Sequence, residues 1–80
     1  MTYEDEVILR NVAAELDRAT TAYGAFASAH EGYAVLLEEV HELWDEVRKR
    51  PGVRSRADMR REATQVAAMA VRFLRDCCDT

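Results

Sequence analysis

Apolar residues recur along this chain at spacings of three and four, which is the period of an α-helix. Proline occurs once and glycine three times, and these helix-breaking residues separate the apolar stretches. Alternation of apolar and polar residues, the signature of a strand, is missing from the sequence. The pattern therefore predicts an all-α chain of three helices that forms a single domain over residues 1–80.

The first helix is predicted from about Glu4 to Tyr23, because acidic residues open it and Gly24 follows it. The residues that repeat at the helical period are Ile8, Val12, Leu16, Ala19 and Tyr23. We expect this stripe to be the buried face of the helix.

The second helix should begin at about Ala29, since Ser28 followed by Glu31 forms a capping-box pattern. In that motif the serine caps the helix and the glutamate reaches back to the amide of the cap residue. The helix must stop before Pro51 and Gly52. Its apolar sector contains Tyr33, Leu36, Val40, Leu43, Trp44 and Val47.

The third helix is predicted from the same kind of signal, with Ser55 as the cap and Asp58 three residues later, and it runs to about Cys78. A short loop joins it to the second helix, so the two should pack antiparallel. Three helices that each carry one apolar stripe form a helical bundle. A chain of 80 residues buries only a modest share of its surface, so we expect homo-oligomerisation to complete this bundle.

Charge and hydropathy narrow the classes of function. The formal net charge of −4 argues against a general nucleic-acid binder. No apolar run approaches the roughly 18 residues of a membrane span, and the acidic start does not resemble a signal peptide, so we expect a cytoplasmic protein without a membrane partner. Cys77 and Cys78 are adjacent, which suits neither a disulfide nor a zinc pair, and we interpret them as reduced thiols.

Acidic residues crowd the second helix beside its apolar sector. Glu38 and Glu42 are four residues apart, which places like charges together on one face, and Glu39 lies at the boundary of the sector. On the third helix Glu62 falls within the apolar stripe, where an unpaired carboxylate is costly to bury, and Gln65 lies one turn later.

Antiparallel packing would bring these acids together across a groove. Glu39 and Glu42 would then face Glu62 and Gln65, and hard oxygen ligands of this kind suit Mg²⁺ or Mn²⁺. Glutamates are also common on solvated helix faces, and a glutamate at the edge of a stripe can extend to water. The joint pattern on two helices favours the metal interpretation.

These residues are similar to the motifs of the MazG-like, all-α nucleoside triphosphate pyrophosphatases. The EExxE motif of that family appears as "EEVHE" (Glu38, Glu39 and Glu42) and its ExxD motif as "EATQ" (Glu62 and Gln65). The surrounding sequence resembles a small single-domain branch of the family over residues 26–76 or so.

The resemblance implies Mg²⁺-dependent hydrolysis of a nucleoside triphosphate to the monophosphate and pyrophosphate, in a homodimer or homotetramer. By the same resemblance Glu39, Glu42 and Glu62 would be metal ligands, and Glu38 would be either a further ligand or the base that prepares the water. Gln65 stands where the motif has Asp, so one negative charge is missing. A neutral amide can still offer one oxygen, and the alternative is a slow or inactive nucleotide-binding or interaction module.

Other polar and aromatic residues have simpler interpretations. Seven of the eleven basic residues fall between Arg48 and Arg61, and we interpret them as a solvated basic segment that offsets the nearby acids, with Arg60 and Arg61 pointing away from the Glu62 stripe. His30 and His41 lack ligand spacing and should lie on the surface. Trp44 and Tyr33 could stack on a base, but their helical spacing favours a place in the core.

Overall fold

The first helix, α1, covers Tyr3–Tyr23 in the computed structural model, which describes residues 1–78. Thr2 caps it: the hydroxyl accepts from the Asp5 amide at 3.1 Å and the Asp5 carboxylate accepts from the Thr2 amide at 3.1 Å. This capping box was not predicted, although Thr2 and Asp5 have the required spacing in the sequence. The helix ends at Gly24, whose φ of 70° lies in a region that favours glycine.

Helix α2 covers Ala29–Val47, and the predicted serine cap is confirmed, since the Ser28 hydroxyl accepts from the Glu31 amide at 3.1 Å. The other half of the predicted capping box is wrong. The Glu31 carboxylate accepts from the amide of Ala27, at 3.0 Å, one residue before the cap. The chain enters the helix from a tight loop, and this brings the Ala27 amide within reach of Glu31.

Helix α3 covers Arg56–Phe73 and continues into a π-helical turn, η1, at Leu74–Cys78. The Ser55 hydroxyl caps α3 by accepting from the Asp58 amide at 3.2 Å. Helical turns extend through Cys78, where the described residues end, and the last turn is wider than that of an ordinary α-helix.

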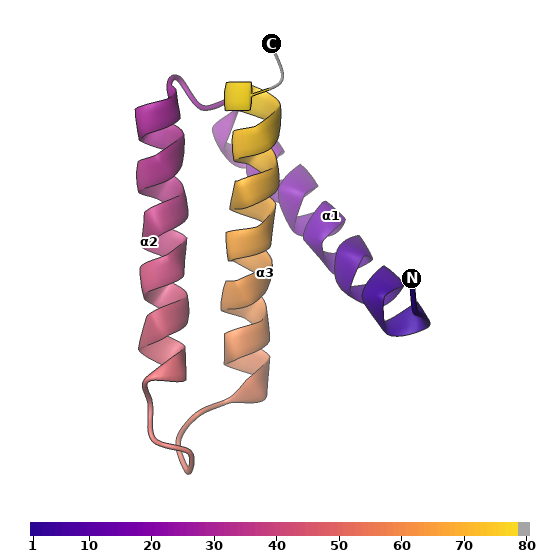
Figure 1. Cartoon of the computed structure of the whole chain (residues 1–80), viewed down its shortest axis with the longest axis vertical. Coiled ribbons are helices and arrows are strands. Elements are labelled where there is room, and N and C mark those ends of the chain that lie inside the picture. Colours follow the sequence, from indigo (N-terminus) through magenta and orange to yellow (C-terminus); the bar gives the residue numbers. More distant parts are fainter. Residues whose placement is uncertain (79–80) are drawn as a thin grey trace.

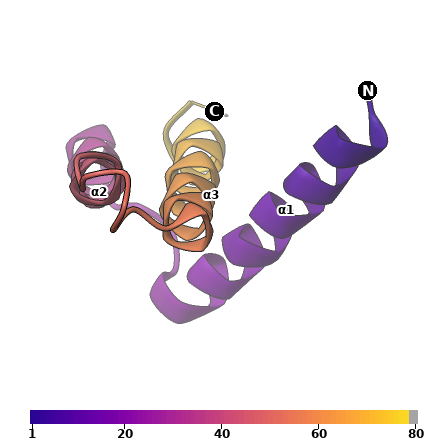
Figure 2. The ribbon, with the colours of Figure 1, turned by 90° about the horizontal axis from the view of Figure 1, so that it is seen from below.

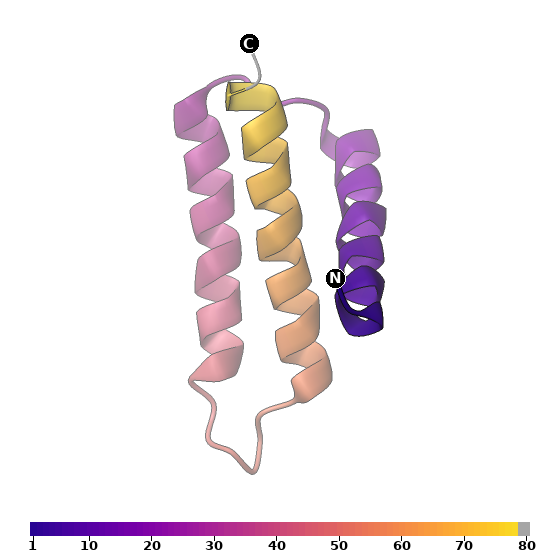
Figure 3. The same ribbon diagram turned by 45° about the vertical axis from the view of Figure 1, so that its right-hand side comes forward.

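Helix α3 is the central element, because α1 and α2 both pack against it. Helices α2 and α3 run antiparallel, side by side, as Figures 1 and 3 show. Seen along the α2–α3 pair, α1 lies on the other side of α3 from α2 and crosses it at an angle (Figure 2). One face of α2 is therefore left without a neighbour.

The core is small for a chain of this length. Its buried apolar residues are Val12, Ala19, Phe26, Ala68 and Met69, and none of the large side chains in the described part of the chain is below 2% exposure. Half-buried residues, among them Leu16, Val35, Leu36 and Phe73, pack around this cluster. The fold buries too little apolar surface to make a strongly stable monomer.

Helix α2 approaches the core closely at Gly32. A Cβ atom built there would lie 2.9 Å from Cδ2 of Phe73 and 3.0 Å from Cδ2 of Phe26. Glycine weakens a helix interior by about 1 kcal/mol relative to alanine. Its presence here is explained by the two aromatic rings that fill the space of a side chain.

Several apolar residues that were predicted to be buried are exposed in the single chain. Tyr33 is 60% exposed and Trp44 58%, so their predicted place in the core is wrong, and Val40 is 41% exposed. On α1 the ends of the predicted stripe, Ile8 and Tyr23, are exposed as well. Val35 and Leu36 of α2 pack against the core, whereas Tyr33, Val40 and Trp44 lie on the exposed side of the same helix.

The search for membrane spans covered the described helices, and none of them combines the length and apolar character needed to cross a bilayer.

Candidate metal centre and adjoining cavity

Three carboxylates from two helices meet where α2 and α3 pack. Glu39 and Glu42 come from α2 and Glu62 from α3, and each offers one oxygen such that all three lie within 4.8 Å of one another. Oxygens on opposite sides of a Mg²⁺ ion are about 4.2 Å apart, since each bond is about 2.1 Å long. The side chains thus need only a small adjustment to fit such an ion.

The antiparallel packing explains this convergence. Residues i and i+3 of a helix lie on one face, so Glu39 and Glu42 project together toward α3. Glu62 occupies the matching height on α3, although its position within the apolar stripe makes it costly to bury. The expected meeting of these acids is therefore present, and their role as metal ligands stays a prediction.

Glu39 is the most perturbed of the acids. Its partial burial, followed by the charges of Glu42 and Glu62 and a hydrogen bond to Glu42, raises the pKa of the Glu39 carboxyl to about 7. Near neutral pH about half of the Glu39 carboxyl groups are therefore protonated. A cation placed among the three acids would favour the ionised form.

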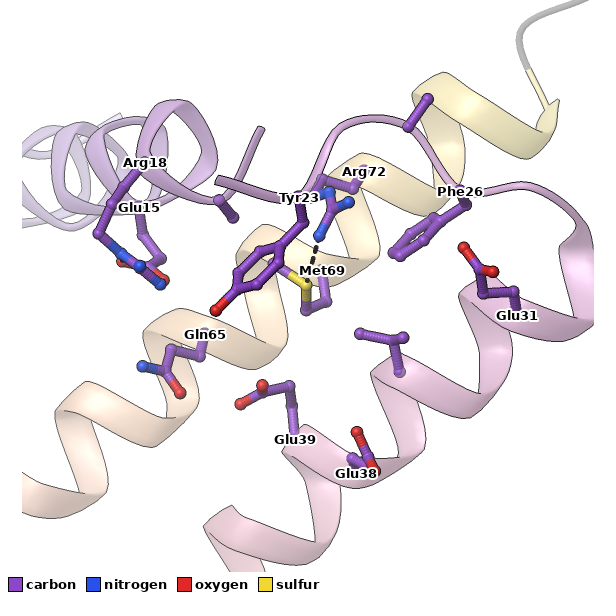
Figure 4. Close-up of a pocket in the computed structure, with 13 residues that line it drawn as sticks. Glu15, Arg18, Tyr23, Phe26, Glu31, Glu38, Glu39, Gln65, Met69 and Arg72 are labelled. Atoms are coloured by element: carbon purple, nitrogen blue, oxygen red, sulfur yellow. Dashed lines mark hydrogen bonds and ion pairs between the residues drawn. The ribbon is translucent and has the colours of Figure 1, made fainter. Parts of the chain in front are cut away.

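Gln65 contacts two of these acids. In the orientation that gives both ends of its amide suitable partners, the Gln65 nitrogen donates to Oε2 of Glu39 at 2.8 Å and to Oε2 of Glu62 at 3.2 Å. The side chain lies directly beside Glu39 (Figure 4). As a metal ligand, Gln65 would have to turn its amide and present the oxygen instead.

Glu38, the predicted base or additional ligand, lies outside the three-acid group. It is exposed on α2 and lines the cavity described below. From that position its carboxylate can reach water in the cavity more readily than it can join the three acids.

Basic residues that follow α2 pair with acids three residues earlier in the chain. Lys49 contacts Glu46 at 2.8 Å, and Arg48 contacts Asp45 at 3.3 Å, which agrees with the predicted offset of charge. Arg61 pairs with Asp58 at 3.2 Å and lies 3.7 Å from the Glu62 carboxylate, while its side chain stays 59% exposed.

A cavity of about 490 Å³ adjoins the acids and extends toward the loop between α1 and α2 (Figure 4). Acidic and basic residues from all three helices line it, together with apolar side chains. The lining residues are Glu15, Arg18, Ala19, Tyr23, Ala25, Phe26, Glu31, Val35, Glu38, Glu39, Gln65, Met69 and Arg72. Sequence reasoning missed the contribution of α1 to this cavity.

The two arginines of the cavity are in different states. Arg18 of α1 pairs with Glu15, with Nε 2.9 Å from Oε2, and this bond lowers the pKa of the Glu15 carboxyl. Arg72 of α3 is only 3% exposed and donates to the carbonyl oxygen of Gly24 at 2.6 Å. Sequence reasoning missed Arg72 too, although it follows the buried Met69 by one helical turn and so lies on the inner face.

The remaining candidates stay outside the site. His30 and His41 are exposed, as predicted, and neither belongs to the group of acids. Cys77 and Cys78 are free thiols, which agrees with their interpretation as reduced cysteines.

Comparison of the chain with models of protein families, with curated proteins and with solved structures found no match. The case for a function therefore rests on the acids, the cavity beside them and the sequence motifs that they form.

Proposed function

We propose that this protein is a divalent-cation-dependent nucleoside triphosphate pyrophosphohydrolase, which converts a nucleoside triphosphate and water into the monophosphate and pyrophosphate. The observation that carries the proposal is the convergence of Glu39, Glu42 and Glu62 within 4.8 Å. The resemblance of their spacing to the motifs of the MazG-like family adds the reaction type. The adjoining cavity has a volume in the range of small-molecule sites.

In this proposal the three acids would hold Mg²⁺ or Mn²⁺, and the cation would neutralise phosphate charge and polarise the bond that is cleaved. Glu39 must release its proton to act as a ligand. Because its pKa is about 7, this release costs little free energy near neutral pH. Glu38 accepts a proton from the attacking water, because it lines the cavity without belonging to the three acids.

Gln65 supports a second candidate function, a helical module that binds a nucleotide or a partner without turnover. Its amide nitrogen donates to Glu39 and Glu62, so it partly neutralises these acids without any metal. An Asp at this position would add a negative charge and a stronger ligand. The two candidates differ in whether pyrophosphate is released.

The proposal includes self-association into a homodimer or homotetramer. Tyr33, Val40 and Trp44 form an exposed stripe along α2, and the buried core of the single chain is small. A second copy that covers this stripe would bury the apolar surface that the fold leaves in water.

The test is pyrophosphate release from a panel of canonical and modified nucleoside triphosphates with Mg²⁺ and with Mn²⁺. We expect the wild type to be active and Gln65→Asp to be about 10-fold more active, since an added ligand charge strengthens metal binding. Glu62→Gln should lose at least about 100-fold while keeping its helical circular dichroism, because one metal ligand is gone.

Asp45→Asn is the matched control, since Asp45 is an acid of α2 that lies outside the three-acid group. It should behave like the wild type. Release of pyrophosphate by neither the wild type nor Gln65→Asp would favour the binding module, and full activity in Glu62→Gln would remove the support for a metal centre.

A further inference from the structure

Arg72 carries a buried guanidinium whose N–H donors have few acceptors in the protein. Its guanidinium has five N–H donors. One donates to the Gly24 carbonyl oxygen at 2.6 Å, one to the Met69 sulfur at 3.3 Å, and Nε has no partner. Within residues 1–78 no carboxylate forms an ion pair with it. A buried cation of this kind is unfavourable unless a further acceptor reaches it.

The cavity offers room for that acceptor. Arg72 lines it on the side away from Glu39, and its guanidinium stacks 4.2 Å from the ring centre of Phe26 (Figure 4). Met69 and Val35 supply apolar walls, and the ring of Tyr23 extends across the rim. This side of the cavity therefore combines the exposed ring of Tyr23 with a strong hydrogen-bond donor, the composition of a site for a flat, neutral ring.

The charges in the cavity decide against a bare phosphate at this end. Glu31 and Glu38 line the cavity in addition to Glu39, while one of the two arginines, Arg18, is already paired with Glu15. A polyanion without a cation would be repelled by these carboxylates. The triphosphate is therefore better placed at the three acids, where a divalent cation would accompany it.

The geometry points to a nucleobase subsite in which Arg72 donates hydrogen bonds to a carbonyl oxygen of the base. This inference rests on the proposed function, which places the triphosphate at the acids and so directs the base toward Arg72. The Nη1 group makes the contact, and the base oxygen replaces the Met69 sulfur, which is only a weak acceptor. Nε is buried and takes no part in the contact. Uracil, thymine, cytosine and guanine carry such an oxygen, and adenine does not.

Binding of non-hydrolysable nucleotides tests the subsite without turnover. The ligands are the 2′-deoxynucleoside α,β-imidotriphosphates of uracil, cytosine, guanine and adenine, titrated with Mg²⁺ by calorimetry. The wild type should bind the nucleotides of the three carbonyl-bearing bases about 10- to 100-fold more tightly than that of adenine. This ratio corresponds to the free energy of one hydrogen bond to a charged donor. Arg72→Met should lose this preference while its affinity for the adenine nucleotide stays nearly constant.

Arg10→Met removes an exposed arginine of α1 that does not line the cavity, and it should keep the wild-type preference. Arg72→Lys, which keeps the charge, should show an intermediate preference if Arg72→Met does not fold. Equal binding of all four bases by the wild type, or a uniform loss of affinity in Arg72→Met, would overturn the subsite.

The same titrations separate this inference from the proposed reaction. Base preference without pyrophosphate release would leave the subsite standing and contradict the hydrolase. Binding of none of the four nucleotides would overturn the subsite together with the proposed function, whereas hydrolysis without base preference would overturn the subsite alone.

Discussion

The carboxyl group of Glu39 should make stability depend on pH in a direction opposite to that of most surface acids. Its pKa is raised to about 7 in the folded chain from an ordinary 4.5, so the folded state binds more protons than the unfolded state between these values. Stability from this group is fully present below pH 4.5 and is lost as pH rises through 7. We expect a loss of about 1 kcal/mol, since solvent screens a partly exposed group.

Chemical denaturation between pH 5 and pH 8 measures this slope. In Glu39→Gln the slope should largely disappear, and millimolar Mg²⁺ should stabilise the wild type more at pH 8 than at pH 6, because the metal competes with the proton. An unchanged slope in Glu39→Gln would mean that other groups carry the pH dependence.

At the scale of the elements, the packing of α2 on α3 depends on one glycine. Gly32→Ala would place a Cβ 2.9 Å from Phe73, 3.0 Å from Phe26 and 3.3 Å from the sulfur of Cys77. These contacts are too short, and overpacking of this kind costs about 1–3 kcal/mol. The gain in helix propensity is about 1 kcal/mol, so we expect net destabilisation of about 1 kcal/mol in a thermal or urea melt.

Gly52→Ala is the control for that substitution. Gly52 lies in the loop between α2 and α3, where an added Cβ would have no atom within 4 Å, and its stability should change by no more than about 0.5 kcal/mol. Stabilisation by Gly32→Ala would show that the two rings move aside easily and that α2 is held less tightly than the structure indicates.

At the scale of the whole molecule, the outer stripe of α2 predicts self-association. Sedimentation at micromolar concentration should give a dimer or tetramer of the 9.1 kDa chain, and Trp44→Glu should shift it toward the monomer by placing a charge in the apolar contact. Val53→Glu, which changes an exposed residue of the loop, should keep the wild-type state. A wild type that sediments as a monomer would contradict the oligomer.

The sequence by itself determined the three helices and their ends. Ser28 and Ser55 cap helices at the predicted residues, and Gly24 ends the first one. These features are local, because a cap or a breaker acts on backbone groups within one turn. The presence of acids on facing sides of α2 and α3 was also predictable, since the helical period and the short loop fix both.

Only the tertiary structure decided which side of each helix is buried. The apolar stripe of α2 is wider than the area that α3 can cover, so the sequence allows more than one side to face inward. The packing of α2 on α3 places Leu36 half-buried against the core and leaves Trp44 in water. The close approach at Gly32 and the buried guanidinium of Arg72 have the same origin. Phe73 lies 41 residues from Gly32 and Gly24 lies 48 residues from Arg72, and contacts over such separations depend on the packing of whole helices, which local patterns do not specify.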